Sequence, residues 1–102
     1  MKKVHVELTI EKPERQVYKK DIELEGHYLK VLYKQAIEKK ELTPYEQDDY
    51  GNALREMMTE AFGGGEAEWR AHLFRRGVET TVTFSNDDVK AAYEELVAEG
   101  KI

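Results

Sequence analysis

Seven residues near the N-terminus have the clearest structural pattern in the chain, and they read Val4-His5-Val6-Glu7-Leu8-Thr9-Ile10. Every second side chain is apolar, so one face of this segment is aliphatic and the other face is polar. Strict alternation over this length is typical of a β-strand with one buried face. The sequence therefore predicts that this segment is a strand with its aliphatic face in the hydrophobic core.

A second strand is expected directly after a turn. Residues 12–15 contain a proline and three charged side chains, which suit a turn, and alternation resumes over residues 17–25. Two residues of this segment break the alternation, because Lys20 takes an apolar position and Val17 takes a polar one. We therefore expect a β-bulge or a frayed start in the second strand.

Three further segments have the period of an α-helix. The first spans about residues 27–41, the second begins after Thr43, and the third spans about residues 85–100. The second has the clearest start, since Thr43 is suited to the N-cap, Pro44 to the first turn and Glu46 to a capping box. Ser85 is the expected N-cap of the last helix.

Residues 68–85 are predicted to form a second hairpin, with its loop at residues 75–78. The register that buries most apolar groups puts Trp69 on one face with Val82 and Phe84, so we expect Trp69 in the core. The predicted element order is ββααββα. It indicates a single α+β domain over residues 1–102, with a four-stranded antiparallel sheet made of two hairpins and three helices packed on one face.

Composition excludes several classes of protein. The chain has 102 residues and no cysteine, which removes disulfides, thiolate catalysis and the commonest structural zinc sites. No apolar run approaches the roughly 18 residues that a membrane span needs, so we expect no membrane partner. The charge of Glu7 interrupts the apolar run that a signal peptide would need near the N-terminus. A cytoplasmic location is therefore expected.

The sequence offers no group that predicts catalysis. Its one serine, Ser85, is explained by its expected role as a helix cap, and the triplet of glycines at 63–65 lacks the residues of a phosphate-binding loop. The histidines are spaced neither as His-x-His nor four residues apart, although His5 and His72 could meet on the polar face of the sheet. We therefore expect a non-enzyme without a cofactor or a metal ion.

The charge is distributed unevenly and suggests a binding surface. The net charge is -5, but residues 41–68 alone carry about -7. Such a segment can steer a protein onto a basic partner, and it can block a nucleic-acid-binding site in that partner. The chain is thus expected to be a small acidic protein-binding module, a regulator or inhibitor of the type that phages and mobile elements encode. The expected partner-binding residues are Glu46, Asp48, Asp49, Glu56 and Glu60.

The alternative is a nucleic-acid-binding domain that uses the polar face of the second hairpin. Cationic side chains beside an aromatic ring can bind phosphates and stack on bases. The residues of this alternative site are Arg70, His72, Phe74, Arg75 and Arg76. The acidic sequence pI of about 5.3 disfavours it. A homodimer formed through an exposed sheet edge is compatible with either interpretation.

Aromatic residues outside the predicted apolar stripes are further candidates for contact with a partner. They are Tyr28, Tyr45 and Phe74. Aromatic side chains with a polar group are enriched at protein interfaces, but they also cover helix ends and sheet edges. The sequence leaves both roles open for these three residues.

Overall fold

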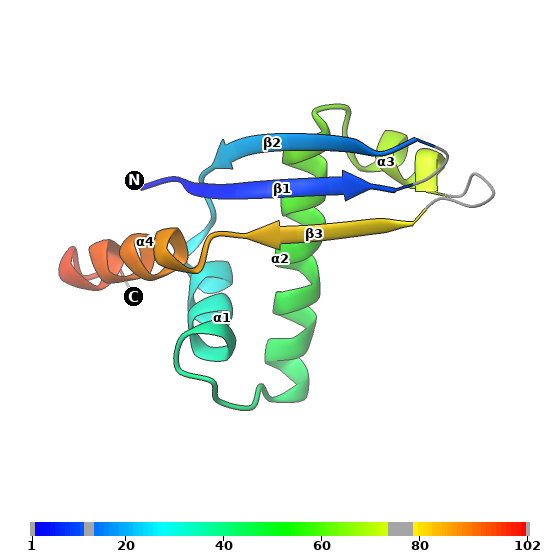
Figure 1. Cartoon of the computed structure of the whole chain (residues 1–102). Helices are drawn as coiled ribbons and strands as arrows, with labels where there is room; N and C mark the ends of the chain where they lie inside the picture. Colours follow the sequence, from blue (N-terminus) through cyan, green and yellow to red (C-terminus); the bar gives the residue numbers. More distant parts are fainter. Residues whose placement is uncertain (1, 12–13, 74–78, 102) are drawn as a thin grey trace.

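The structure is a computed structural model of the chain, and it describes residues 2–11, 14–73 and 79–101. These residues form three strands and four helices, which are arranged as in Figure 1. In chain order, they are β1 (Val4–Ile10), β2 (Gln16–Ile22), α1 (Gly26–Ala36), α2 (Pro44–Phe62), α3 (Glu66–Leu73), β3 (Thr80–Phe84) and α4 (Asn86–Ala98).

The sheet is antiparallel and has the strand order β2-β1-β3. The predicted first strand, β1, is central, and its aliphatic side chains are at most 2% exposed. The ladder between β1 and β2 runs without interruption from Val4↔Ile22 to Ile10↔Gln16, so the expected bulge is wrong. Lys20 lies on the helix side of the sheet, opposite Val6. Its ammonium group is 3.5 Å from a carboxylate oxygen of Glu60 in α2, which explains the charged residue at an apolar position.

The predicted four-stranded sheet with three helices, in the order ββααββα, is wrong. The molecule is α+β, but residues 66–73 form helix α3 where the first strand of a second hairpin was expected. Acidic Glu66 and Glu68 lie in the first turn of α3, and basic Arg70 and His72 lie in its last turn. This distribution of charge complements the helix dipole. Without a hairpin partner, β3 pairs with β1 instead.

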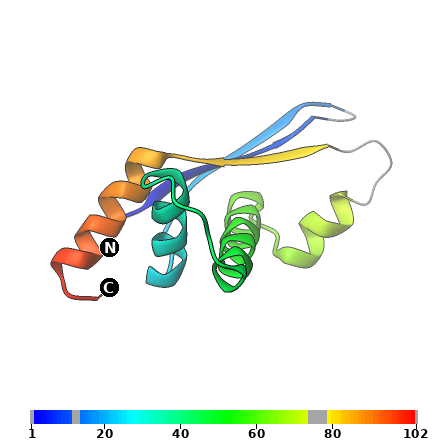
Figure 2. The ribbon, with the colours of Figure 1, turned by 90° about the horizontal axis from the view of Figure 1, so that it is seen from below.

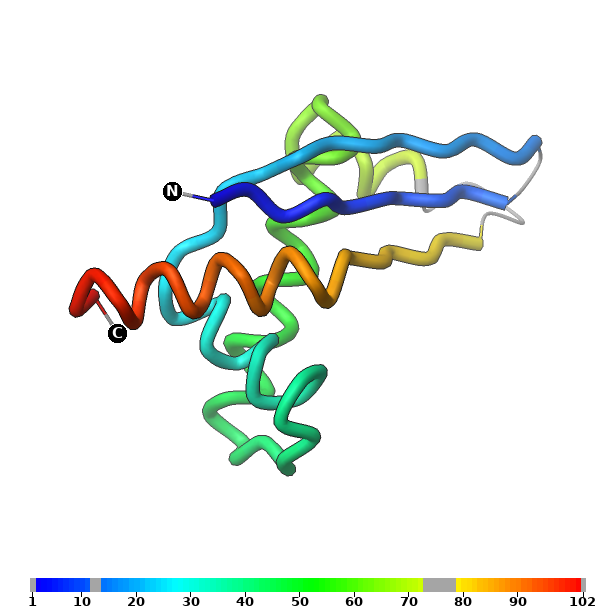
Figure 3. Tube along the Cα trace, turned by 60° about the vertical axis from the view of Figure 1, so that its left-hand side comes forward, coloured from blue at the N-terminus to red at the C-terminus, as the bar shows by residue number. Residues whose placement is uncertain are grey.

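The helices cover one face of the sheet. Figure 2 shows α1, α2 and α3 on the same side of the strands, with α1 and α3 flanking α2. Helix α4 continues from the end of β3 and packs beside α1 (Figure 3), where the rings of Tyr33 and Tyr93 stack at 4.2 Å. In the described part of the chain, no helix covers the opposite face, which carries His5, Glu7 and Thr9 of β1.

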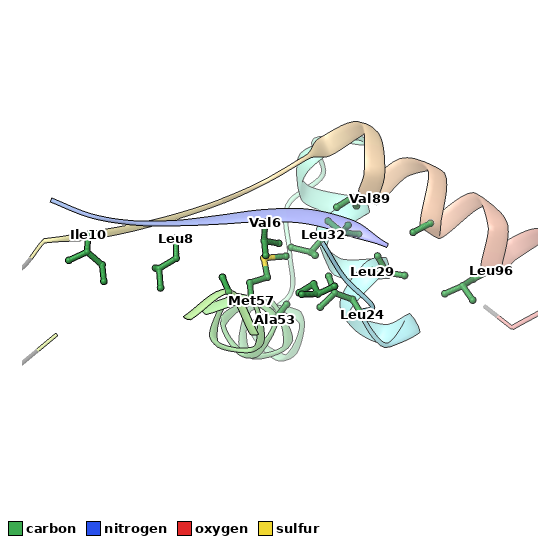
Figure 4. Packing of buried hydrophobic residues seen from close by; sticks show 14 residues of the cluster. Val6, Leu8, Ile10, Leu24, Leu29, Leu32, Ala53, Met57, Val89 and Leu96 are labelled. Atoms are coloured by element: carbon green, nitrogen blue, oxygen red, sulfur yellow. The ribbon is translucent and has the colours of Figure 1, made fainter. Parts of the chain in front are cut away.

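The core lies between β1 and the helices. Figure 4 shows Val6 of β1 above Met57 and Ala53 of α2, with Leu29 and Leu32 of α1 beside them. These five side chains are completely buried. Trp69 is only 6% exposed, so its predicted burial is confirmed, although it belongs to helix α3 and not to a strand. The indole N–H of Trp69 donates a hydrogen bond of 2.9 Å to the Thr59 hydroxyl of α2.

The predicted helix starts at Thr43 and Ser85 are confirmed. The Thr43 hydroxyl accepts a hydrogen bond from the backbone N–H of Glu46, whose carboxylate accepts one from the N–H of Thr43, and together these bonds make a capping box. The Ser85 hydroxyl accepts from the N–H of Asp88. Helix α2 ends at Gly63, whose φ of 79° is the left-handed conformation that glycine adopts without strain.

Candidate functional site

Glu46, the first predicted partner-binding residue, forms its contacts within the protein, with Lys34 and Thr43. Besides its bond to the N–H of Thr43, its carboxylate lies 2.7 Å from the ammonium group of Lys34 in α1. The hydrogen bond from Lys34 and the backbone bond from Thr43 lower the pKa of Glu46 to about 2. Glu46 therefore joins the start of α2 to α1, and it presents little charge to a partner.

Glu60 is also paired. It lies 3.5 Å from Lys20 of β2, and this contact ties the C-terminal half of α2 to the sheet. Two of the five predicted acidic residues thus have roles in the fold. The sequence could not separate them from the others, because their partners Lys20 and Lys34 come from distant elements.

The other three predicted residues, Asp48, Asp49 and Glu56, have no ion pair within the described residues. They follow Tyr45 by three, four and eleven residues, so they lie on the same side of α2 as this tyrosine. Tyr45 is 77% exposed, and Asn52 lies on the same side. We call this surface the acidic ridge, and its members are Tyr45, Asp48, Asp49, Asn52 and Glu56.

Sequence reasoning named Tyr45 as an aromatic residue outside the core but did not assign it to the acidic site. The signal that connects them is the helical spacing from Tyr45 to Asp48, Asp49 and Glu56. An exposed aromatic ring gives a binding surface apolar area, which carboxylates alone do not supply. The structure therefore places an exposed aromatic ring beside carboxylates without ion pairs on one side of α2.

The acidic ridge borders a negatively charged depression next to α1. Tyr28 of α1 is half-buried there, and burial raises the pKa of its hydroxyl, as do the charges of Glu25, Glu56 and Asp49. The depression is open and measures about 190 Å³. Its lining residues are Tyr28, Asn52, Arg55, Glu56, Thr59 and Glu66. A shallow, open surface of this kind suits contact with a protein better than enclosure of a small molecule.

Two residues of the alternative arginine site, Arg70 and His72, lie in the described part of the chain. Arg70 and His72 lie on α3, not on a strand; Phe74, Arg75 and Arg76 lie outside the described residues. The Arg70 guanidinium is 3.0 Å from the Glu66 carboxylate and sits over the Trp69 ring. His72 is half-buried, with its ring 6.0 Å from that of Phe62. Arg70 and His72 therefore form no cationic strand with a stacking platform.

The histidines do not meet. His5 lies on the open face of the sheet, where its ring nitrogens are 2.8 Å from Asp21 and 3.2 Å from Glu7. These hydrogen bonds, led by that to Asp21, raise the pKa of His5. His72 is on α3, so the two do not share a sheet face as the sequence suggested. The described residues contain no group of three or more His, Asp or Glu side chains that could hold a metal ion.

No protein-family model, curated protein or solved structure matched the chain. Among the described residues, no helix combines the length and the apolar character needed to cross a membrane.

Proposed function

We propose that this chain is a small, non-catalytic protein-binding module that presents the acidic ridge of α2 to a basic surface on a partner protein. Binding would regulate or inhibit that partner by occupying its basic surface, including one that otherwise binds nucleic acid. The proposal keeps the cytoplasmic setting and the phage or mobile-element type expected from the sequence. It needs no cofactor.

One observation carries the proposal. Tyr45 is 77% exposed and shares its helix face with carboxylates that form no ion pair within the described residues. Two other carboxylates of α2 do form ion pairs, Glu46 with Lys34 and Glu60 with Lys20. Uncompensated charge around an aromatic group favours association with a surface of opposite charge.

The test is a quantitative pull-down from extracts of the native cell with three forms of the full chain. They are the parent, a ridge variant in which Asp48, Asp49 and Glu56 are replaced by Lys, and a control variant with the same change of charge at Glu14, Glu23 and Glu94. The control residues are exposed and lie away from α2. We expect one stoichiometric protein that the parent and the control retain and the ridge variant loses.

Other outcomes contradict the proposal. Equal recovery of all partners by the ridge variant and the control would remove the acidic ridge as the binding surface. Recovery that disappears after nuclease treatment would favour nucleic acid as the partner, which is the alternative expected from the sequence.

A further inference from the structure

The two edges of the sheet differ in how they are protected. Edge strand β2 carries Lys19, Lys20 and Asp21, and charged residues on an edge hinder pairing with another strand. Edge strand β3 has the sequence Thr-Thr-Val-Thr-Phe, which contains no charge and no proline. All of these residues favour strands. β3 is therefore the edge that can accept a further strand.

The backbone groups on the outer side of β3 can be assigned from the ladder. The N–H of Ser85 donates to the carbonyl of His5, and the N–H of Glu11 donates to the carbonyl of Glu79. Because bonded pairs alternate in an antiparallel ladder, the main-chain groups of Thr81 and Thr83 also face β1. Those of Thr80, Val82 and Phe84 face outward, and no hydrogen bond in the described residues uses them.

A second unsatisfied group lies at the same edge. The side-chain hydroxyl of Thr80 is buried and has no hydrogen-bond partner among the described residues. Buried polar groups without partners are uncommon and costly in folded proteins. The Thr80 hydroxyl is buried, so the hydrogen-bonding positions that stay open along this short strand are the outward main-chain groups of Thr80, Val82 and Phe84.

We propose that β3 binds an extended segment of a partner protein, which adds to the sheet as a fourth strand. The main chain of Thr80, Val82 and Phe84 would supply the hydrogen bonds of this strand addition. The site is separate from the acidic ridge and does not depend on the function proposed for that ridge.

The helical layer determines what can occupy this position. α1 and the N-terminal half of α2 extend past β3 on the covered face (Figures 1 and 3), so they would support one added strand from below. A second copy that paired antiparallel through β3 would be related by a twofold axis perpendicular to the sheet. Its helices would therefore lie on the same face of the joined sheet. Its α1 and α2 would then compete for the space beyond β3. A single extended segment avoids this conflict.

The chemistry of the added segment follows from its surroundings. Side chains that point toward the helices would lie near half-buried Val82 and Phe84, so β-branched or aromatic residues fit there. Residues 86–102, which follow β3, carry a net charge of about -3, and exposed Asp87 lies close to the end of the strand. The favoured segment is therefore an alternating apolar strand with basic residues at its ends.

A designed peptide with this chemistry tests the proposal. The probe is the capped, fluorescein-labelled peptide Lys-Thr-Val-Thr-Val-Thr-Lys, titrated into the full chain and followed by fluorescence anisotropy. Val82→Pro removes one outward N–H without removing a bond to β1, and Lys19→Pro does the same on β2. We expect Val82→Pro to weaken binding by about tenfold or more and Lys19→Pro to change it by less than about twofold.

Hydrogen exchange on the parent protein gives a readout that does not depend on how either variant folds. Addition of the peptide should slow exchange of the amides of Thr80, Val82 and Phe84, while the outward amides of Val17, Lys19 and Asp21 stay unchanged. Four results would overturn the proposal: no saturable binding, protection on β2 or on the acidic ridge instead, equal binding by both proline variants, or a parent dimer that Val82→Pro dissociates.

Discussion

Glu46 joins α1 to the start of α2 through its carboxylate, and its ionisation should be visible in the pH dependence of stability. Its pKa is about 2 in the folded protein against an ordinary 4.5. A lowered folded-state pKa stabilises the protein above the unfolded-state pKa, and this stabilisation is lost as the pH falls through the folded-state value. Glu46→Gln should therefore be less stable than the parent at neutral pH, and the difference should vanish as the pH falls from about 4.5 to about 2.

Urea melts of the parent and Glu46→Gln across this pH range measure the difference. Gln retains an oxygen for the capping box, so the pH-dependent part reports mainly the charge next to Lys34. Lys34→Gln is the matched control, because it removes the cation and should flatten the same pH step. A parent-to-variant difference that stays constant from neutral pH to about 2 would show that the pair with Lys34 is not formed.

Tyr45 should matter to binding and not to folding. Its ring is 77% exposed, so Tyr45→Ala removes few packing contacts and should change the free energy of unfolding by less than about 0.5 kcal/mol. If the acidic ridge binds a partner, truncation of this aromatic side chain should cost about 2 kcal/mol of binding free energy. Calorimetry against the protein recovered by pull-down measures this loss. Val97→Ala on α4, another exposed apolar side chain, is the control and should bind as the parent does.

Gly51 inside α2 and Gly63 at its C-cap should respond in opposite ways to replacement by alanine. Gly51 lies inside α2 with open space where a Cβ atom would be added, so Gly51→Ala should stabilise the protein by up to about 1 kcal/mol. Gly63 ends the helix at a φ of 79°, and Gly63→Ala should destabilise it by about 1 kcal/mol because a side chain is strained there. Thermal unfolding of both variants measures the difference. Stabilisation by both alanines would mean that α2 continues through Gly63.

Helix α3 should depend on Trp69 for its position. Trp69→Ala removes a nearly buried indole and should cost about 3–5 kcal/mol in the free energy of unfolding. Trp69→Phe keeps an aromatic ring but loses the hydrogen bond to Thr59, so its cost should be smaller. Urea melts followed by far-ultraviolet circular dichroism rank the two. Equal stability of Trp69→Ala and the parent would show that α3 is not packed through this side chain.

The elements that the sequence predicted correctly are those whose signals are local. The alternation of β1 and the caps at Thr43 and Ser85 depend on residues a few positions apart. In α3, the short alternation around Trp69 imitated a strand, while the acidic start and basic end of the segment indicated a helix. The pairing of β3 with β1 joins residues that are far apart in the chain, and no local pattern encodes it.

The candidate site was predictable to the same extent. Helical spacing is local, so the sequence already placed Asp48, Asp49 and Glu56 together in an acidic segment. The ion pairs of Glu46 with Lys34 and of Glu60 with Lys20 are tertiary contacts, and only the folded structure separates these two carboxylates from the rest of the predicted site. The role of Lys20 cannot be recognised from the strand sequence alone, because its partner Glu60 lies in α2. Lys20 looked like a defect in the alternation, but it is the partner of a charge on another element.

Across the whole molecule, the net charge is -5, and the acidic ridge concentrates three carboxylates on one side of α2. If the ridge attracts a basic partner, association should be electrostatic and should depend on the salt concentration. Reversing Asp48, Asp49 and Glu56 to Lys should slow association with the recovered partner much more than it speeds dissociation. Screening acts over about 8 Å at physiological ionic strength, so the difference from the parent should shrink as salt is added. Stopped-flow association rates at two salt concentrations measure this. The control reversal of Glu14, Glu23 and Glu94 changes the net charge equally, and its smaller effect would locate the steering field on α2. Equal slowing by both variants would mean that net charge, rather than the ridge, governs the encounter.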